Sequence, residues 1–150
     1  MTNGQTLTIE RAYQAPARRV FDAFTSVEVM RRWWHPAPDW DTPEASVDLR
    51  VGGRLRVVMR DPGTDRRYGG GGEYTEIDPP NRLVFTWTWD DDRDQARQVI
   101  EIDFDEQDGI TTVRFTHGNL WDEEAVRSHR EGWEAAFDNL ARTVERVKPG

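Results

Sequence analysis

The sequence contains no cysteine, which excludes disulfide bonds, zinc–thiolate centres and cysteine nucleophiles. It also contains no apolar run close to the roughly 20 residues that a membrane-spanning helix requires. Residues 1–8 lack the basic segment and following apolar stretch that are typical of a secretory signal. From these absences we expect a soluble, cytoplasmic protein without membrane insertion.

Basic charge is in deficit, with 28 acidic against 20 basic side chains and a formal net charge of −8. A protein that binds nucleic acid needs a positive face for the phosphates, and anionic membrane surfaces attract basic residues for the same reason. The composition therefore argues against a nucleic-acid partner and against an anionic membrane surface.

Side chains that hold metals or attack substrates are also scarce. The histidines are His35, His117 and His129, and the serines are Ser26, Ser46 and Ser128. The histidine positions do not have the spacing of a metal-ligand set. Ser128 and His129 are neighbours on one predicted helix, so they cannot face each other as a nucleophile and its base. The glycine run 69–72 lacks the lysine of a phosphate-binding loop. We expect no metal, no cofactor and no nucleophilic catalysis.

Tryptophan, by contrast, is abundant: the chain has seven, together with few leucines. Each indole ring buries roughly 150–250 Å² and carries one N–H that needs a hydrogen-bond partner. Small cores are usually built from aliphatic side chains, whereas wide rings with polar edges are typical of the lining of a ligand cavity. The composition therefore indicates a module that binds a flat, apolar small molecule, without identifying that molecule.

The N-terminal part of the chain predicts a strand followed by two short helices. Residues 6–13 alternate between apolar and polar side chains, as a half-buried strand does. Pro16 precedes apolar residues at helical spacing over 17–25, which predicts the first helix. Ser26 is a suitable N-cap for a second short helix that ends near Trp34.

The remainder predicts six strands and a long helix. Strands are expected over 45–51, 54–60, 73–78, 82–89, 97–104 and 110–117, separated by the turn signals Gly52-Gly53, Asp61-Pro62-Gly63, Pro79-Pro80-Asn81 and Asp108-Gly109. In the strand 45–51, the apolar side chains Val47, Leu49 and Val51 share one face. The glycine run 69–72 is expected at a hairpin tip or at a bulged strand start. Residues 122–147 carry apolar side chains at spacings of three and four, as one long helix does.

Strands joined by tight turns form an antiparallel sheet, and the long helix must bury its apolar stripe against one face of it. We therefore expect a single α+β domain over residues 1–150. Its antiparallel sheet of six to seven strands packs one face against the long C-terminal helix, and two short helices follow the first strand.

Several segments, taken in order, resemble one protein family. They are 15–24 (APARRVFDAF), Trp33-Trp34, Val51-Gly52-Gly53, 73–87 (EYTEIDPPNRLVFTW), Gly132-Trp133 and Leu140. Together they resemble the bacterial homologues of the activator of the heat-shock-protein-90 ATPase. That family belongs to the helix-grip superfamily of START domains and the birch-pollen allergen. The resemblance extends over about residues 6–147.

The resemblance implies a helix-grip fold with a hydrophobic cavity between the curved sheet and the C-terminal helix. It also implies a class of ligand, because related proteins bind polyketide-like or lipid-like molecules and a few protect their hosts from toxic natural products. The family name refers to a eukaryotic co-chaperone, but no motif for engaging a chaperone is visible in this sequence. We therefore do not expect chaperone binding.

Inward-facing positions of the predicted elements define the candidate ligand-binding residues. They are Trp34, Met59, Tyr74, Phe85, Trp87, Trp89, Phe104, Phe115, His117, Trp133 and Phe137. The alternative is that these rings fill the interior completely, because protein interiors pack without large voids. Adjacent residues of a helix face different ways, so at most one of Trp33 and Trp34 is expected to face a cavity.

Three further positions carry open alternatives. His117 is expected on the inner face, where it either orients a ligand as a polar group or general base, or is satisfied by its protein neighbours. His129 lies near the helix stripe, either at the cavity mouth or exposed to solvent. Gly132 costs about 1 kcal/mol relative to alanine inside a helix, a cost that close approach to a ring or ligand would explain.

Three functional hypotheses follow. The first is a non-enzymatic carrier, monomeric or homodimeric, for a hydrophobic small molecule that is aromatic or lipid-like. The second is a cyclase or hydrolase that uses the same cavity, with His117 as a proton shuttle. The third is a chaperone-regulating interaction domain, which needs an exposed apolar face. Charged outward positions such as Arg56, Glu101 and Arg114 argue against it.

Overall fold

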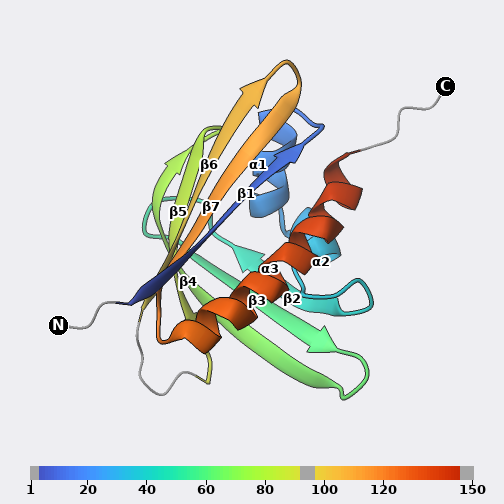
Figure 1. Ribbon diagram of the computed structural model, residues 1–150, viewed down its shortest axis with the longest axis vertical. Helices are drawn as coiled ribbons and strands as arrows, with labels where there is room; N and C mark the ends of the chain where they lie inside the picture. Colours follow the sequence, from blue (N-terminus) through green and yellow to red (C-terminus); the bar gives the residue numbers. More distant parts are fainter. Residues whose placement is uncertain (1–3, 92–96, 146–150) are drawn as a thin grey trace.

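The computed structural model describes residues 4–91 and 97–145 (Figure 1). Its elements are β1 (Gln5–Tyr13), α1 (Ala17–Thr25), α2 (Val27–Trp33), β2 (Asp41–Val47), β3 (Arg54–Asp61), β4 (Arg66–Asp78), β5 (Arg82–Trp89), β6 (Gln98–Gln107), β7 (Ile110–Leu120) and α3 (Glu123–Val144). This is the predicted order of one strand, two short helices, further strands and a long helix. The structure and its topology confirm the expected helix-grip fold.

All seven strands belong to one antiparallel sheet in the order β1-β7-β6-β5-β4-β3-β2. In this order β1 and β2 lie at opposite edges of the sheet, and the two short helices connect them. Figure 1 shows α3 lying across the sheet, with α1 and α2 beside the C-terminal part of α3. The residues between the sheet and α3 form the hydrophobic core.

The long helix begins where the sequence supplies its first-turn interactions. Asp122 is the N-cap, and its side chain accepts a hydrogen bond from the Ala125 N–H at 2.7 Å. Glu123 and Glu124 in the first turn interact favourably with the positive end of the helix dipole. The helix ends at Val144, and the predicted last residues up to 147 lie partly outside the described residues.

The turn at Asp108 and Gly109 was predicted from the dipeptide alone and is confirmed. Both residues have positive φ angles, 54° and 80°, as a tight two-residue hairpin turn requires. Ser26 occupies the predicted N-cap position of α2, but its side chain makes no capping bond. Its carbonyl accepts the Met30 N–H at 2.8 Å instead.

The predicted strand 45–51 is wrong in its boundaries. The observed β2 spans Asp41–Val47, and the side chains of Leu49 and Val51 are 43% and 63% exposed. The chain turns earlier than expected, because the Arg50 N–H bonds the Asp48 carbonyl and the Gly53 N–H bonds the Arg50 carbonyl. At the other end of the strand, Pro43 is tolerated because β2 is an edge strand.

The position of the glycine run 69–72 is also corrected. These residues lie inside the long strand β4, with no turn there, and the irregularity of the strand falls later, between Tyr74 and Glu76. A Cβ atom at Gly70 would lie 2.6 Å from the ring of Trp87, and one at Gly72 only 1.8 Å from the Thr86 carbonyl oxygen. Glycine is used here because the neighbouring strand and its indole ring approach the β4 backbone closely.

Candidate ligand-binding cavity

A cavity of about 740 Å³ lies between the N-terminal half of α3 and the strands β3, β4 and β5, with the end of α2 beside it. The lining residues are Trp34, His35, Pro36, Trp40, Met59, Tyr68, Gly69, Trp87, Trp89, Asp91, Trp121, Ser128, His129, Gly132, Trp133 and Ala136. Helix α3 supplies the small residues Ser128, Gly132 and Ala136 together with the rings of His129 and Trp133. This volume falls in the range of roughly 300–1,000 Å³ that is typical of small-molecule sites.

The wall is aromatic to an unusual degree, because it includes six of the seven tryptophans. Trp34 is at its centre: the ring lies nearly parallel to Trp87, with centroids 6.1 Å apart, and 5.6 Å from Trp133. Trp89 meets Trp87 edge to face at 5.2 Å. A separate stacked pair, Trp40 and Tyr68 at 5.5 Å, covers another part of the wall.

Trp33 is the one tryptophan that does not line the cavity. Its ring is fully buried, and its indole N–H donates to the carbonyl of Ala23 in α1 at 2.8 Å. It stacks on Trp34 with centroids 5.3 Å apart. Of the adjacent pair, Trp34 therefore faces the cavity and Trp33 anchors it from behind.

His117 fixes the orientation of Trp133 from the interior side. The Trp133 indole N–H donates to His117 Nδ1 at 3.0 Å, and His117 Nε2 lies 2.6 Å from Gln98 Oε1. Because Nδ1 accepts a bond, the ring proton resides on Nε2 and is donated to Gln98. Burial, together with the nearby His129, lowers the pKa of His117 to about 3. His117 is therefore a neutral, fully satisfied histidine behind the wall.

His129 holds Trp89 in the same way, from its position in α3. The Trp89 indole N–H donates to His129 Nε2 at 3.1 Å, and His129 Nδ1 donates to the Ala125 carbonyl at 2.7 Å. Burial lowers the pKa of His129, although the bond to the Ala125 carbonyl opposes this shift. The rings of His129 and His117 lie only 5.1 Å apart, so two neutral imidazoles support two indoles of the wall.

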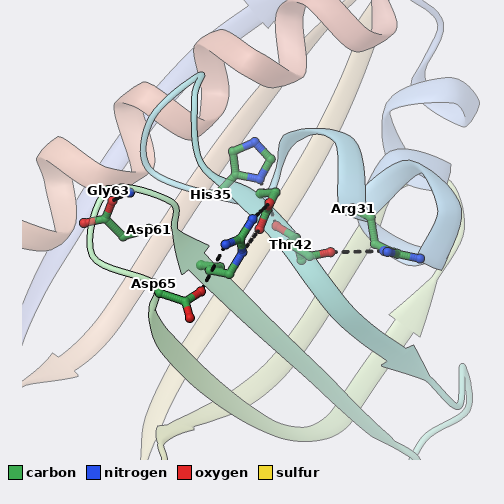
Figure 2. Close-up of polar contacts among 8 residues, drawn as sticks. Arg31, His35, Thr42, Asp61, Gly63 and Asp65 are labelled. Carbon is green, nitrogen blue, oxygen red and sulfur yellow. Dashed lines mark hydrogen bonds and ion pairs between the residues drawn. The ribbon is translucent and has the colours of Figure 1, made fainter.

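His35 presents one ring nitrogen that its protein neighbours do not use. The hydroxyl of Thr42 donates to the Trp34 carbonyl at 2.8 Å, so towards His35 Nδ1, also 2.8 Å away, it can only accept. The ring proton therefore resides on Nδ1. Figure 2 shows the second nitrogen directed away from Thr42, and within residues 4–91 and 97–145 this Nε2 atom has no hydrogen-bond partner. Burial lowers the pKa of His35, opposed by Asp41.

The structure brings together some of the predicted ligand-binding residues and separates others. Trp34, Met59, Trp87, Trp89 and Trp133 line the cavity. Tyr74, Phe85, Phe104, Phe115, His117 and Phe137 do not line it, although all six are buried as expected. They lie where neighbouring rings meet directly; Phe115, for example, is 4.6 Å from Trp133 and 5.1 Å from Phe137. A ligand role for any of these residues remains a prediction.

Sequence reasoning missed several lining residues. Trp40 lies in the loop before β2, and Trp121 lies between β7 and α3. Tyr68 belongs to β4, in a part of that strand to which the sequence had assigned no inward face. The only available signal was the aromatic character itself. His129, expected either at the cavity mouth or exposed to solvent, lines the cavity. A Cβ atom at Gly132 would be 3.6 Å from Pro36 Cβ, an ordinary contact, so close packing does not explain that glycine.

Within residues 4–91 and 97–145, no three His, Cys, Asp or Glu side chains gather as a metal site would require. None of the described helices is long and apolar enough to cross a membrane.

Comparison with known structures shows that the fold is shared. A protein from Chromobacterium violaceum is 23% identical, with a TM-score of 0.85, over 95% of this chain and 98% of that chain. The AHSA1 protein from Silicibacter pomeroyi is 28% identical (TM-score 0.77; 91% and 95% covered). The AHSA1-like protein from Aeromonas hydrophila is 26% identical (TM-score 0.79; 94% and 92% covered). A comparison with functionally curated proteins finds no match.

The family comparison agrees with these structural matches and with the resemblance found in the sequence motifs. The family model described as Activator of Hsp90 ATPase homolog 1-like protein matches residues 14–145, which include every described element after β1. The fold and its buried aromatic cluster are compatible with ligand binding. The chain therefore belongs to the Activator of Hsp90 ATPase homolog 1-like family, within the helix-grip superfamily.

Proposed function

We propose that this domain binds a hydrophobic small molecule, aromatic or lipid-like, in the cavity between α3 and strands β3–β5. The observation that carries the proposal is the aromatic wall: six tryptophans line a space of about 740 Å³ instead of filling it. Burying an apolar ligand against such rings is favourable at roughly 25 cal/mol per Å² of surface removed from water. In this proposal the domain acts as a cytoplasmic monomer or homodimer and performs no chemistry on its ligand.

The geometry of the wall supports binding over collapse. Trp133 and Trp89 each donate their indole N–H to a histidine, and these bonds hold the two rings at the edge of the space. If these two rings moved in to close the cavity, both bonds would break, and each polar group left unpaired would cost about 1–3 kcal/mol. A preformed wall also lowers the ordering cost of binding.

The cyclase or hydrolase alternative depended on His117 as a proton shuttle. His117 is fully buried, both of its ring nitrogens are engaged, and it is absent from the cavity lining. A general base must come within hydrogen-bonding reach of the proton that it removes. These contacts favour a carrier over an enzyme that depends on this histidine.

The chaperone-regulating alternative needs an exposed apolar face, and the outer face of the sheet is charged instead. Arg82 bonds the carboxylates of Glu76, Glu101 and Asp103, and Arg114 bonds Glu10. Such a face is well solvated and offers no large apolar surface to a partner. The charged face therefore favours small-molecule binding over chaperone regulation.

The proposal is tested by adding bulk to the cavity wall. We suggest titrating planar polyketides, flavonoids and fatty acids into the protein, following tryptophan emission and melting temperature. Ala136→Leu places a larger side chain on the lining face of α3, whereas Ala135→Leu, the neighbouring position outside the lining, is the matched control. We expect at least one compound to raise the melting temperature of the parent and of the control variant, because a ligand of the folded state stabilises it.

For such a compound, Ala136→Leu should weaken binding at least tenfold while the control keeps the parent affinity. Equal binding by both variants would place the ligand elsewhere. The absence of any shift across the three compound classes at millimolar concentration would count against the proposed function itself.

A further inference from the structure

The charge of the cavity wall limits the kind of head group that a ligand can carry. Asp91 is part of the lining, and among the lining residues that the structure describes there is no lysine or arginine. The whole chain carries a formal charge of −8. The electrostatic field at this opening therefore favours cations over anions.

The histidines of the wall do not supply positive charge near neutral pH. Burial lowers the pKa of both His35 and His129, so each is uncharged at pH 7. His35 offers a lone pair on Nε2, since its single proton is committed to Thr42. The polar group that this part of the wall presents is a hydrogen-bond acceptor, and its natural partner is a donor on the ligand.

The faces of the aromatic rings also attract cations. Trp40, Trp89 and Trp133 line the space and are only partly buried, so part of each ring is open to a ligand. The face of an indole ring is negative, and a cation within about 6 Å of it gains roughly 0.5–2 kcal/mol, more when the site excludes water. A carboxylate in the same place meets negative ring faces and loses its hydration without compensation.

We propose that the cavity selects a hydrophobic amine bound as its ammonium ion, with the aromatic wall around the charged group, His35 Nε2 as an acceptor and Asp91 at the opening. This inference rests on the proposed function, since it assigns a ligand class to the same cavity. It predicts that amines bind more tightly than neutral alcohols, and that both bind more tightly than carboxylates. It therefore places fatty acids among the poorest ligands of this protein.

The test uses three probes that share one ring system and differ only in charge: anthracene carrying an aminomethyl, a hydroxymethyl or a carboxylate group at the same position. Each is titrated into the purified protein at pH 7 in low salt, and energy transfer from tryptophan to anthracene reports binding. We expect the amine to bind about tenfold more tightly than the carboxylate, with the alcohol in between.

Two variants separate the contributions of charge and hydrogen bonding. Asp91→Asn removes an exposed charge and should weaken only the amine, by about two- to fivefold, with an effect that salt reduces. His35→Phe removes the acceptor and should weaken amine and alcohol alike. Asp105→Asn, an exposed acid of β6 outside the cavity lining, is the matched control and should change neither.

The outcomes are distinguishable. If the carboxylate or the alcohol binds as tightly as the amine, the charge selectivity is overturned while cavity binding stands. If Asp91→Asn changes the amine no more than Asp105→Asn does, the assigned role of Asp91 is wrong. If none of the three probes binds the parent protein, the proposed function fails and this inference fails with it.

Discussion

The two halves of the layer between α3 and the sheet are both rich in aromatic side chains, yet one is solid and the other hollow. In the solid half Phe24 lies 4.8 Å from Trp33, 5.6 Å from Phe104 and 6.3 Å from Phe137, measured between ring centroids. In the hollow half the rings of Trp34, Trp87, Trp89 and Trp133 line about 740 Å³ of space. Aromatic content alone therefore does not determine whether a cavity forms.

The difference lies in what faces the rings. In the solid half the short helices α1 and α2 bring their own side chains into the layer, and Phe21 of α1 reaches Phe104 at 5.4 Å. In the hollow half α3 presents the small residues Gly132 and Ala136 on either side of the Trp133 ring, and β4 presents Gly69. Large rings opposite small residues leave a gap, whereas large rings opposite large rings close it.

The largest effect is expected from removing a ring in the solid half. Phe24→Ala should lower the free energy of unfolding by about 3–5 kcal/mol, because the ring is fully buried and its neighbours cannot collapse into the gap. Trp121→Ala, at the rim of the hollow half and 54% exposed, is the counterpart and should change it by less than about 0.5 kcal/mol. Urea denaturation measures both, and equal losses would break the distinction between the two halves.

A smaller loss is expected from adding a methyl group where a ring already touches the backbone. Gly70→Ala brings a Cβ to 2.6 Å from Trp87, so it should lower the free energy of unfolding by about 1–3 kcal/mol and change tryptophan emission. The measurements are chemical denaturation and fluorescence. Unchanged stability would mean that Trp87 can move freely into the cavity, and the wall would then not be preformed.

The hollow half should also make stability depend on pH, through the two histidines that hold its wall. The pKa of His117 lies at about 3 in the folded protein, below its unfolded value of about 6.5. Between these values the unfolded state binds the extra proton, so stability is highest above pH 6.5 and falls as the pH decreases. The slope is at most about 1.4 kcal/mol per pH unit for each such histidine, and His129 acts in the same direction.

Urea midpoints at pH 7, 6 and 5 measure this slope before most carboxylates titrate. His117→Asn keeps an acceptor for the Trp133 indole without a titrating ring and should flatten the profile. A variant profile as steep as that of the parent would contradict the assignment of the pH dependence to this residue.

The smallest effect is a gain in stability at the hollow face of α3. Gly132→Ala should raise the free energy of unfolding by up to about 1 kcal/mol, because the new Cβ meets only Pro36 at 3.6 Å and the helix loses a flexible residue. Thermal and urea unfolding measure this gain, and Gly70→Ala is the comparison because it places the same methyl group against the Trp87 ring. A loss at Gly132 would show that the space there is already occupied in solution.

Much of the fold could be predicted from local patterns. The turn at Asp108-Gly109 needs two residues with positive φ, and the alternation of Leu83, Phe85 and Trp87 marks one buried face of β5. Boundaries failed in two places. Local turn hydrogen bonds at Arg50 and Gly53 end β2 before Leu49, whereas pairing with the neighbouring strands carries β4 through the glycines 69–72.

The site was less predictable than the fold. Phe85 and Trp87 share a face of the same strand, yet only Trp87 lines the cavity. Trp40, Tyr68 and Trp121 escaped prediction because no periodicity assigned them to an inward face. Alternation specifies the direction of a side chain and carries no information about the distance to the element that it faces.

By itself, the amino-acid sequence determined the order of the elements, the antiparallel sheet with a helix packed on it, the negative charge and the supply of indole rings, since all of these depend on composition and short-range spacing. Tertiary structure alone decided that side chains fill the layer beside α1 and α2 but leave a cavity next to Gly132 and Ala136, and that His117 supports the wall from behind. The physical reason is that a cavity is defined by pairs of surfaces from distant segments, and such pairs exist only once the chain has folded.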